Sequence, residues 1–184
     1  MDTLTRFDMD ILHFIHENMS CEFLDAVMPI ITSTCEWGII WIAAAVIMLF
    51  FRKTRRCGAA AGGALAGCLL IGNVILKHLV ARDRPCWIES DHLMLVAVPK
   101  DFSFPSGHSM ASFAAAVVIF HYNKKAGIAA LALAVLIAFS RLYLFVHFPT
   151  DVLAGALIGT GIAIAACVAA DRIAERINRR SHRA

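Results

Sequence analysis

The sequence predicts an all-α protein, a polytopic bundle of membrane-spanning helices that forms one domain over residues 1–184. Hydrophobic residues make up 59% of the chain and charged residues only 17%, whereas a soluble domain is usually about 45–50% apolar and about 25% charged. The apolar residues gather in uncharged runs, and lysine and arginine gather on one side of those runs. Together these observations favour five transmembrane helices and allow a short sixth one, preceded by an amphipathic helix.

Residues 1–20 show no secretory signal, because they carry acidic residues and lack a long apolar core. A helix through this segment places Phe7, Ile11, Phe14 and Ile15 on one face. This pattern predicts an amphipathic helix that lies in the membrane interface. The alternative is a polar lead-in that packs on the bundle.

Five uncharged runs reach the roughly 20 apolar residues that a membrane helix needs, either alone or with their flanks. They cover residues 37–51, 57–76, 109–120, 126–146 (interrupted by Ser140 and Arg141) and 152–170. A sixth run, residues 23–34, is short and contains Asp25 and Pro29. We expect this run to be a short span, a re-entrant segment or an interfacial helix.

The basic residues indicate the orientation. If the chain crosses the membrane at each run, residues 52–56, residues 124–125 and the tail 171–184 share one face. The positive-inside rule makes that face cytoplasmic, so 171–184 is predicted to be a basic cytoplasmic tail. The loop 81–104 and the turn 147–150 then lie on the opposite face, which is extracytoplasmic if the chain sits in the plasma (inner) membrane.

Small residues fit a packed bundle. Glycines spaced four apart in apolar runs predict close approach of helices, and they are Gly58 and Gly62, Gly63 and Gly67, Gly155 and Gly159. The six cysteines show no metal-binding spacing. We expect them to be small buried residues rather than disulfide partners.

Three polar clusters lie at the outer ends of the runs, where a charge near the membrane needs a partner or a function. The first contains Lys77 and Arg84, followed by Pro85. A lysine at the end of a span can simply extend to the interface. A pair of cations at this place also suits an anionic ligand.

The second cluster, Pro105-Ser106-Gly107-His108, comes just before an apolar run. Serine is a good N-cap, and glycine lets the backbone approach a ligand closely. The free N–H groups at a helix N-terminus bind phosphate. Alone, this segment indicates only the start of a helix, because polar caps of this kind are common.

The third cluster is Ser140-Arg141, His147 and Asp151, with Pro149 between them. Arg141 lies within an apolar segment and needs a counter-charge or an anionic ligand. Pro149 suits the first position of a helix, in which Asp151 would be a capping residue. Alternatively, the Asp151 carboxylate accepts a hydrogen bond from one ring nitrogen of His147 and leaves the other nitrogen free to attack.

The topology brings the three clusters to one face of the membrane, and together they suit phosphoryl transfer. Its transition state spreads negative charge over oxygens, so positioned cations and N–H groups do most of the stabilising. One histidine can be the nucleophile, and the other can protonate the leaving oxygen. Because no acidic cluster suggests a magnesium site, we expect no metal and no cofactor.

The three clusters resemble the motifs of the type-2 phosphatidic acid phosphatase superfamily of membrane lipid phosphatases. Those motifs are K-x6-R-P, P-S-G-H and S-R-x5-H-x3-D, and all eleven specified positions match in order and spacing. The resemblance implies a six-helix bundle, with residues 23–34 as its short first span. It also implies metal-independent hydrolysis of a lipid phosphate.

The resemblance also implies a role for each site residue. His147 is then the nucleophile, Asp151 its orienting partner, and His108 the general acid and later the base that activates water. The phosphate would be held by Lys77, Arg84, Ser106, Gly107 and Arg141. The other histidines are expected to be bystanders, and Glu89, Asp91 and Asp101 are expected to be solvated loop charges.

The predicted function is that of a lipid phosphatase, with a lipid phosphate and membrane lipids as partners and no nucleic acid. Undecaprenyl diphosphate is preferred because the chain is small, the loop 81–104 is short and the site faces outward; phosphatidylglycerol phosphate and phosphatidic acid are alternatives.

The same residues suggest two other functions. A vanadium haloperoxidase shares the anion-binding motifs, but such enzymes are soluble. A membrane carrier that only binds lipid phosphate would need no nucleophile or acid. The oligomeric state is left open.

Overall fold

The computed structural model describes residues 3–91 and 94–181, and every regular element in these ranges is helical. The longer helices are α1 Thr3–Met19, α2 Glu22–Thr34, α3 Ile39–Phe50, α4 Arg55–Cys68, α7 Gly107–Tyr122, α8 Lys124–Tyr143 and α9 Pro149–Ser181. The shorter ones are the 3-10 helix η1 Glu36–Gly38, the π-helix η2 Leu69–Leu76, α5 Lys77–Val80 and α6 Pro85–Ile88. The predicted all-α class is confirmed.

Several helices are those of a multi-pass membrane protein. Three are long and apolar enough to cross a bilayer: Arg55–Ile88, Lys124–Tyr143 and Pro149–Arg179. A fourth span is present if α2 and the helix Glu36–Phe50, which are bent by 40° relative to each other, count as one. Length and composition therefore identify three or four spans in the described residues, and the predicted count of six crossings is not confirmed.

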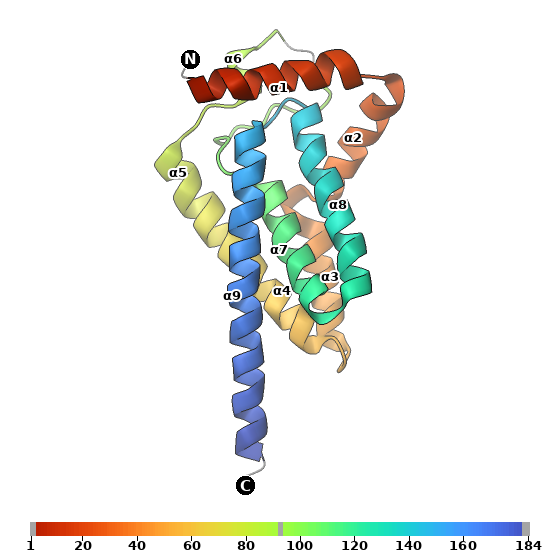
Figure 1. Cartoon of the computed structure of the whole chain (residues 1–184), viewed down its shortest axis with the longest axis vertical. Helices are drawn as coiled ribbons and strands as arrows, with labels where there is room; N and C mark the ends of the chain where they lie inside the picture. The colour runs from red at the N-terminus through yellow and green to blue at the C-terminus, as the bar shows by residue number, and fades with distance from the viewer. Residues whose placement is uncertain (1–2, 92–93, 182–184) are drawn as a thin grey trace.

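The junction of α2 and α3 differs from the expectation that residues 23–34 and 37–51 cross separately. Trp37 (φ 54°) and Gly38 (φ 72°) adopt left-handed backbone conformations between the two helices, which interrupts the helical hydrogen bonding. In Figure 1, α3 continues in the same general direction as α2, toward the end of the bundle at which α4 begins. They are therefore halves of one bent pair rather than a hairpin.

The helix α1 lies across one end of the bundle, and the C-terminal end of α9 lies at the other (Figure 1). The side of α1 that faces the bundle buries Met9, Leu12 and Ile15. Phe7 and Phe14 remain 59% and 61% exposed. The apolar face predicted for this helix is thus divided, because Ile15 packs inward while Phe7 and Phe14 do not.

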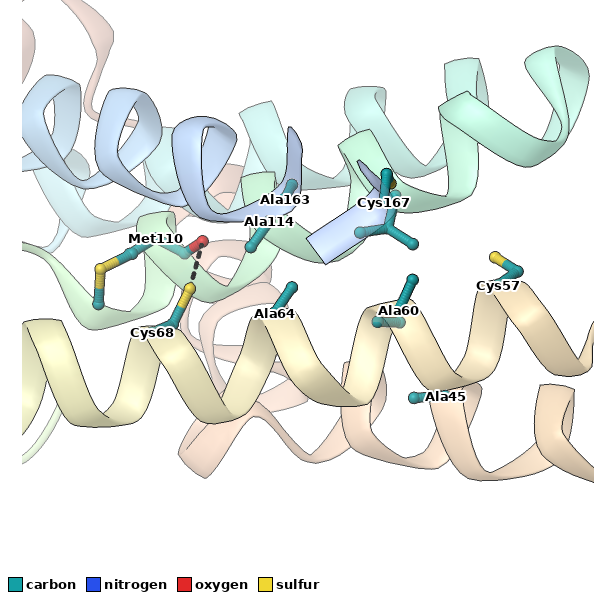
Figure 2. Close-up of a cluster of buried hydrophobic side chains, with 11 residues drawn as sticks. Ala45, Cys57, Ala60, Ala64, Cys68, Met110, Ala114, Ala163 and Cys167 are labelled. Atoms are coloured by element: carbon teal, nitrogen blue, oxygen red, sulfur yellow. Dashed lines mark hydrogen bonds between the residues drawn. The ribbon is translucent and has the colours of Figure 1, made fainter. Parts of the chain in front are cut away.

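The helices α4, α7 and α9 pack through small side chains (Figure 2). Ala64, Ala114 and Ala163 are buried together, and the thiol of Cys68 donates to the carbonyl oxygen of Met110 at 3.8 Å. Small residues let helix backbones approach closely in a membrane protein. All six cysteines are free, and five of them are buried.

Two glycines set the distance between α7 and α9. A Cβ atom at Gly155 would lie 2.6 Å from the carbonyl oxygen of Ser106, and one at Gly159 would lie 2.2 Å from a backbone oxygen of α7. The close approach predicted for this pair is confirmed, and the start of α9 therefore lies beside the start of α7.

In the other two glycine pairs, a Cβ atom at Gly58 would lie 2.7 Å from the Ala45 carbonyl oxygen and one at Gly67 would lie 3.0 Å from Ile162, as predicted. The prediction is wrong for Gly62 and Gly63, which have open space beside them.

Candidate active site

A cavity of about 1140 Å³ brings most of the predicted site residues together. Its lining includes Lys77, Arg84, Gly107, His108, Arg141 and His147. Ser106 and Asp151 lie outside this lining and are fully buried, with the Ser106 N–H donating to the Asp151 carbonyl oxygen at 3.1 Å. The three sequence clusters therefore meet at one end of the bundle.

His147 lies buried in the short connection between α8 and α9. Its Nδ1 atom is 3.7 Å from Oδ2 of Asp151 and 3.3 Å from Oγ of Ser103, while Nε2 is 3.2 Å from Nη1 of Arg84. A carboxylate beside Nδ1 favours a proton on that nitrogen, which leaves the Nε2 lone pair directed at the cations. Burial, together with the positive charges of Arg84 and Arg141, lowers the pKa of His147 well below its usual range, so the ring is neutral at neutral pH.

Asp151 lies in the first turn of α9, which begins at Pro149 as predicted. Its Oδ2 atom accepts hydrogen bonds from Oγ of Ser103 at 2.5 Å and from the backbone N–H of Phe148 at 2.9 Å. The same carboxylate therefore caps the start of the helix and lies beside the imidazole of His147. The capping interpretation of Asp151 is therefore confirmed. The direct hydrogen bond of the other interpretation is absent, because Nδ1 and Oδ2 are 3.7 Å apart and the Ser103 hydroxyl contacts both groups.

Lys77 and Arg84 share one carboxylate, that of Asp101. Arg84 donates from Nη2 to Oδ1 at 2.8 Å and from Nε to the Asp101 carbonyl oxygen at 2.6 Å, and Lys77 is ion-paired with Oδ2. Burial alone raises the pKa of Asp101, but the two cations outweigh it and lower this pKa to about 2. The prediction that Asp101 is a solvated loop charge is wrong, because the loop before α7 brings its half-exposed side chain against both cations.

Arg141 is buried on α8 and lines the same cavity. It donates from Nη1 to Oγ1 of Thr32 on α2. Its Nε atom is buried without a hydrogen-bond partner in the part of the chain that the structure describes. The sequence predicted a counter-charge or an anionic ligand for Arg141. The structure provides a neutral hydroxyl, which leaves the positive charge available to an anion in the cavity.

The N-terminus of α7 faces this group of cations. Ser106 is its N-cap, as predicted, and accepts hydrogen bonds from the N–H of Ser109 at 3.4 Å and from the Ser109 hydroxyl at 3.0 Å. Gly107 and His108 follow in the first turn and line the cavity. Free N–H groups and the partial positive charge of a helix N-terminus suit a phosphate at this place.

Three further residues reach the site, and the sequence did not single them out. Ser103 is fully buried and contacts both His147 and Asp151. Arg82 donates from Nη1 to Oδ1 of Asp151 at 2.7 Å, and from Nη2 to Asp8 of α1 at 2.8 Å. Arg82 lies inside the Lys77–Pro85 motif and Ser103 lies just before the Pro105–His108 motif, so their places in the sequence could have indicated them. The sequence around Asp8 contains no such signal.

The other histidines that the structure describes do not line the cavity. His13 pairs with Glu89 at 2.9 Å and His121 with Asp171 at 3.0 Å, so Glu89 is not the free solvated charge that was expected. His92 lies outside the described residues. Within those residues, no group of three or more His, Cys, Asp or Glu side chains is placed to hold a metal ion.

This fold and site define a membrane-embedded helical protein in which cations and a helix N-terminus surround a buried histidine. The chain belongs to the PAP2 superfamily, whose family model matches residues 57–174. All eleven motif positions fall within this range, whereas Asp8 and the whole of α1 lie outside it.

Relatives agree with this membership. The undecaprenyl-diphosphatase of Sulfolobus acidocaldarius is 33% identical over 125 residues, which are 67% of this chain and 60% of that protein. The match thus spans about three fifths of that relative's length. A transmembrane PAP2-type phosphatidylglycerolphosphate phosphatase from Bacillus subtilis has a similar fold, with a TM-score of 0.67 and 28% identity over 93% of this chain and 96% of that one. LpxE of Aquifex aeolicus gives a TM-score of 0.70 and 26% identity over 86% and 93%.

Proposed function

We propose that this chain is an integral-membrane phosphatase that removes phosphate from a lipid phosphate or diphosphate, without a metal ion, through a phosphohistidine on His147. The observation that supports this most is a buried imidazole with Asp151 at Nδ1 and the Arg84 guanidinium at Nε2. Phosphoryl transfer is catalysed mainly by positioning and by stabilising charge on the phosphoryl oxygens. This site supplies both.

In the first step, Nε2 of His147 attacks the phosphorus, and the bond from phosphorus to the leaving oxygen breaks. The three site cations Lys77, Arg84 and Arg141 neutralise the phosphoryl oxygens, together with N–H groups at the start of α7. His108 lines the same cavity. It gains a proton beside the anionic substrate, since a neighbouring negative charge favours the charged form of the ring, and gives that proton to the leaving oxygen.

In the second step, the neutral His108 accepts a proton from water as the water oxygen attacks the phosphorus. The bond between phosphorus and Nε2 of His147 breaks, and inorganic phosphate leaves. His108 is then protonated again, and His147 returns to its neutral form with the proton on Nδ1 facing Asp151.

The shape of the cavity supports a lipid as the substrate. Beyond the cations it continues between α3 and α4, where Ile42, Val46, Leu49 and Gly58 line it. Gly58 and Lys77 are separated by roughly 28 Å along the helix at 1.5 Å per residue, close to the ~30 Å thickness of a bilayer's hydrocarbon core. An acyl or prenyl chain can lie in this apolar part while its phosphate is bound by the cations.

Undecaprenyl diphosphate is the substrate that we propose first. The Sulfolobus acidocaldarius relative is an undecaprenyl-diphosphatase, and the loop before α7 is short. Phosphatidylglycerol phosphate is the alternative that the Bacillus subtilis structure suggests, and phosphatidic acid is a third. A carrier that only binds lipid phosphate is less well supported, because binding alone does not need an oriented histidine.

We also propose five crossings, formed by α2 with α3, α4 with α5, α7, α8 and α9. Figure 1 places α1 at the end of the bundle where α7 and α9 begin, and residues 52–54, the turn between α7 and α8 and the C-terminal end of α9 at the other end. The basic residues of that second end make it cytoplasmic. The site would then face the extracytoplasmic side of the plasma (inner) membrane, with α1 in the interface on that side and the tail from residue 171 in the cytoplasm.

Phosphate release from the three lipids by detergent-purified protein in EDTA, beside the variant His147→Ala, tests the proposal. Release by the wild type and none by the variant would support metal-free histidine chemistry, and the rates would rank the substrates. Equal release by both proteins would refute the role of His147. If EDTA abolished release and added metal restored it, the metal-independent mechanism would be wrong.

A further inference from the structure

A buried carboxylate connects α1 to the site. Asp8 is fully buried on the side of α1 that faces the bundle. Its Oδ2 accepts hydrogen bonds from Nη2 of Arg82 at 2.8 Å and from the hydroxyl of Thr150 at 2.5 Å, and its Oδ1 accepts one from the Thr150 N–H at 3.2 Å. Both oxygens are therefore bound by residues that adjoin the site, and neither faces solvent.

Arg82 connects this carboxylate to that of Asp151. Its Nη1 atom donates to Oδ1 of Asp151 at 2.7 Å and to Oγ1 of Thr150 at 2.7 Å, and its guanidinium lies 4.0 Å from the ring centroid of Phe148. One guanidinium thus bridges two fully buried carboxylates. Because Oδ1 of Asp151 is bound on this side, Oδ2 is the oxygen that faces Ser103 and the imidazole of His147.

We infer that Asp8 and Arg82 are positioning residues for the nucleophile, acting through Asp151. Asp8 fixes the guanidinium of Arg82, Arg82 fixes the carboxylate of Asp151, and Asp151 sets the ring orientation and tautomer of His147. This inference rests on the proposed function of His147 as the nucleophile. It extends the catalytic apparatus into α1, which lies outside the part of the chain that the PAP2 family model matches.

Holding α1 in place does not require this arrangement. Met9 and Leu12 bury apolar surface against the bundle, and His13 pairs with Glu89 at 2.9 Å. A buried ion pair carries a large desolvation cost, and well-packed apolar residues often stabilise a fold as well or better. A charged group at position 8 is therefore better explained by the orientation of Arg82 than by the attachment of α1.

Four variants separate these two explanations: Asp8→Asn, Arg82→Gln, the double variant, and the control Glu89→Gln. The control removes the ion pair of His13, another polar contact of α1, but does not touch the site. We expect Asp8→Asn and Arg82→Gln each to lower kcat on the order of tenfold to hundredfold, since small errors in the position of a reacting group have effects of this size. KM and the inhibition constant of inorganic phosphate should stay within about twofold, because the three site cations are unchanged.

The double variant gives the sharpest outcome. If Asp8 acts through Arg82, the double variant should lose no more activity than Arg82→Gln alone, whereas independent effects would multiply. Arg82→Lys keeps the charge but lacks the fork that reaches two carboxylates, so we expect a kcat between those of the wild type and Arg82→Gln.

Thermal unfolding and size-exclusion profiles in detergent show which variants are folded. If Asp8→Asn yields no folded protein, the comparison of Arg82→Lys, Arg82→Gln and Glu89→Gln remains. The inference is overturned if Asp8→Asn or Arg82→Gln keeps the kcat of Glu89→Gln, or if the losses multiply. His147→Ala, assayed alongside, distinguishes this failure from a failure of the proposed function, because an active His147→Ala would refute the phosphohistidine itself.

Discussion

Replacing Asp101 with asparagine tests whether this carboxylate and the substrate phosphate compete for the same cations. In the structure, Asp101 binds Lys77 through Oδ2 and Arg84 through Oδ1. In the proposed mechanism, both cations bind the phosphoryl group that His147 attacks. Binding of phosphate therefore requires Asp101 to release them, and Asp101→Asn removes the charge that competes.

The size of the effect follows from the exposure of Asp101. Its side chain is 56% exposed, so each ion pair contributes about 0.5–1 kcal/mol, as for pairs near the surface. Two pairs amount to about 1–2 kcal/mol, and 1.4 kcal/mol corresponds to a factor of ten in a binding constant. We expect inorganic phosphate to inhibit Asp101→Asn at a concentration on the order of tenfold lower than the wild type.

The assay measures product inhibition by phosphate during hydrolysis of the lipid, with Asp91→Asn as the control. Asp91 is an exposed acid of the same outer loop, so this variant removes one negative charge without touching the cations. The reasoning fails if phosphate inhibits Asp101→Asn more weakly than the wild type, since Asp101 would then be needed to orient Arg84. It also fails if Asp91→Asn gives the same increase, because the effect would then reflect overall charge alone.

Four further predictions follow from the geometry. Because the pKa of Asp101 is about 2, it stays ionised from about pH 5 to 8, and the ratio of phosphate inhibition constants for Asp101→Asn and wild type should not change over this range. Gly155→Ala places a Cβ atom 2.6 Å from the Ser106 carbonyl oxygen and should lower the free energy of unfolding by about 1–3 kcal/mol; Gly63→Ala, with open space around it, should not, and chemical denaturation measures both. A reporter fused before α1 should be extracytoplasmic with five crossings and cytoplasmic with six, and labelling of intact cells distinguishes the two. The lowered pKa of His147 gives a contribution to stability that is present above the unfolded pKa of about 6.5 and is lost as the pH falls below it, so acidification from about pH 7 to 5 should reduce the melting temperature of the wild type more than that of His147→Gln.

The sequence contained most of the helical architecture because membrane helices are set by length and apolar composition, which are local properties. The prediction from length and apolar composition fails in the α2–α3 region. Residues 23–34 and 37–51 look like two spans, but Trp37 and Gly38 adopt a conformation that bends the chain without reversing it. A left-handed backbone at a tryptophan has no signal in composition, so counting apolar runs does not show that these two runs form one bent pair.

The site was predictable to the extent that its residues form short motifs. Ser106 caps α7, and Pro149 begins α9, because capping and proline geometry depend on neighbours in sequence. Asp101 was misjudged, because whether a loop acid is solvated depends on which distant cations the loop meets. Asp8 is the extreme case: it lies 74 residues from Arg82 and 142 from Thr150, and a single amphipathic helix gives no reason to expect an acid on its buried side.

Burial assigns different roles to the two carboxylates that flank the site. Asp8 is fully buried and bound through both oxygens by groups that do not contact the cavity, so releasing Arg82 would leave an uncompensated buried charge, at a cost of several kcal/mol. Asp101 is half exposed, so water can solvate it as it leaves Lys77 and Arg84, and an incoming phosphate can replace it. In the proposed mechanism, the cations that change partners in each catalytic cycle are therefore paired with the exchangeable acid. The cation that stays fixed behind Asp151 is paired with the acid that cannot leave.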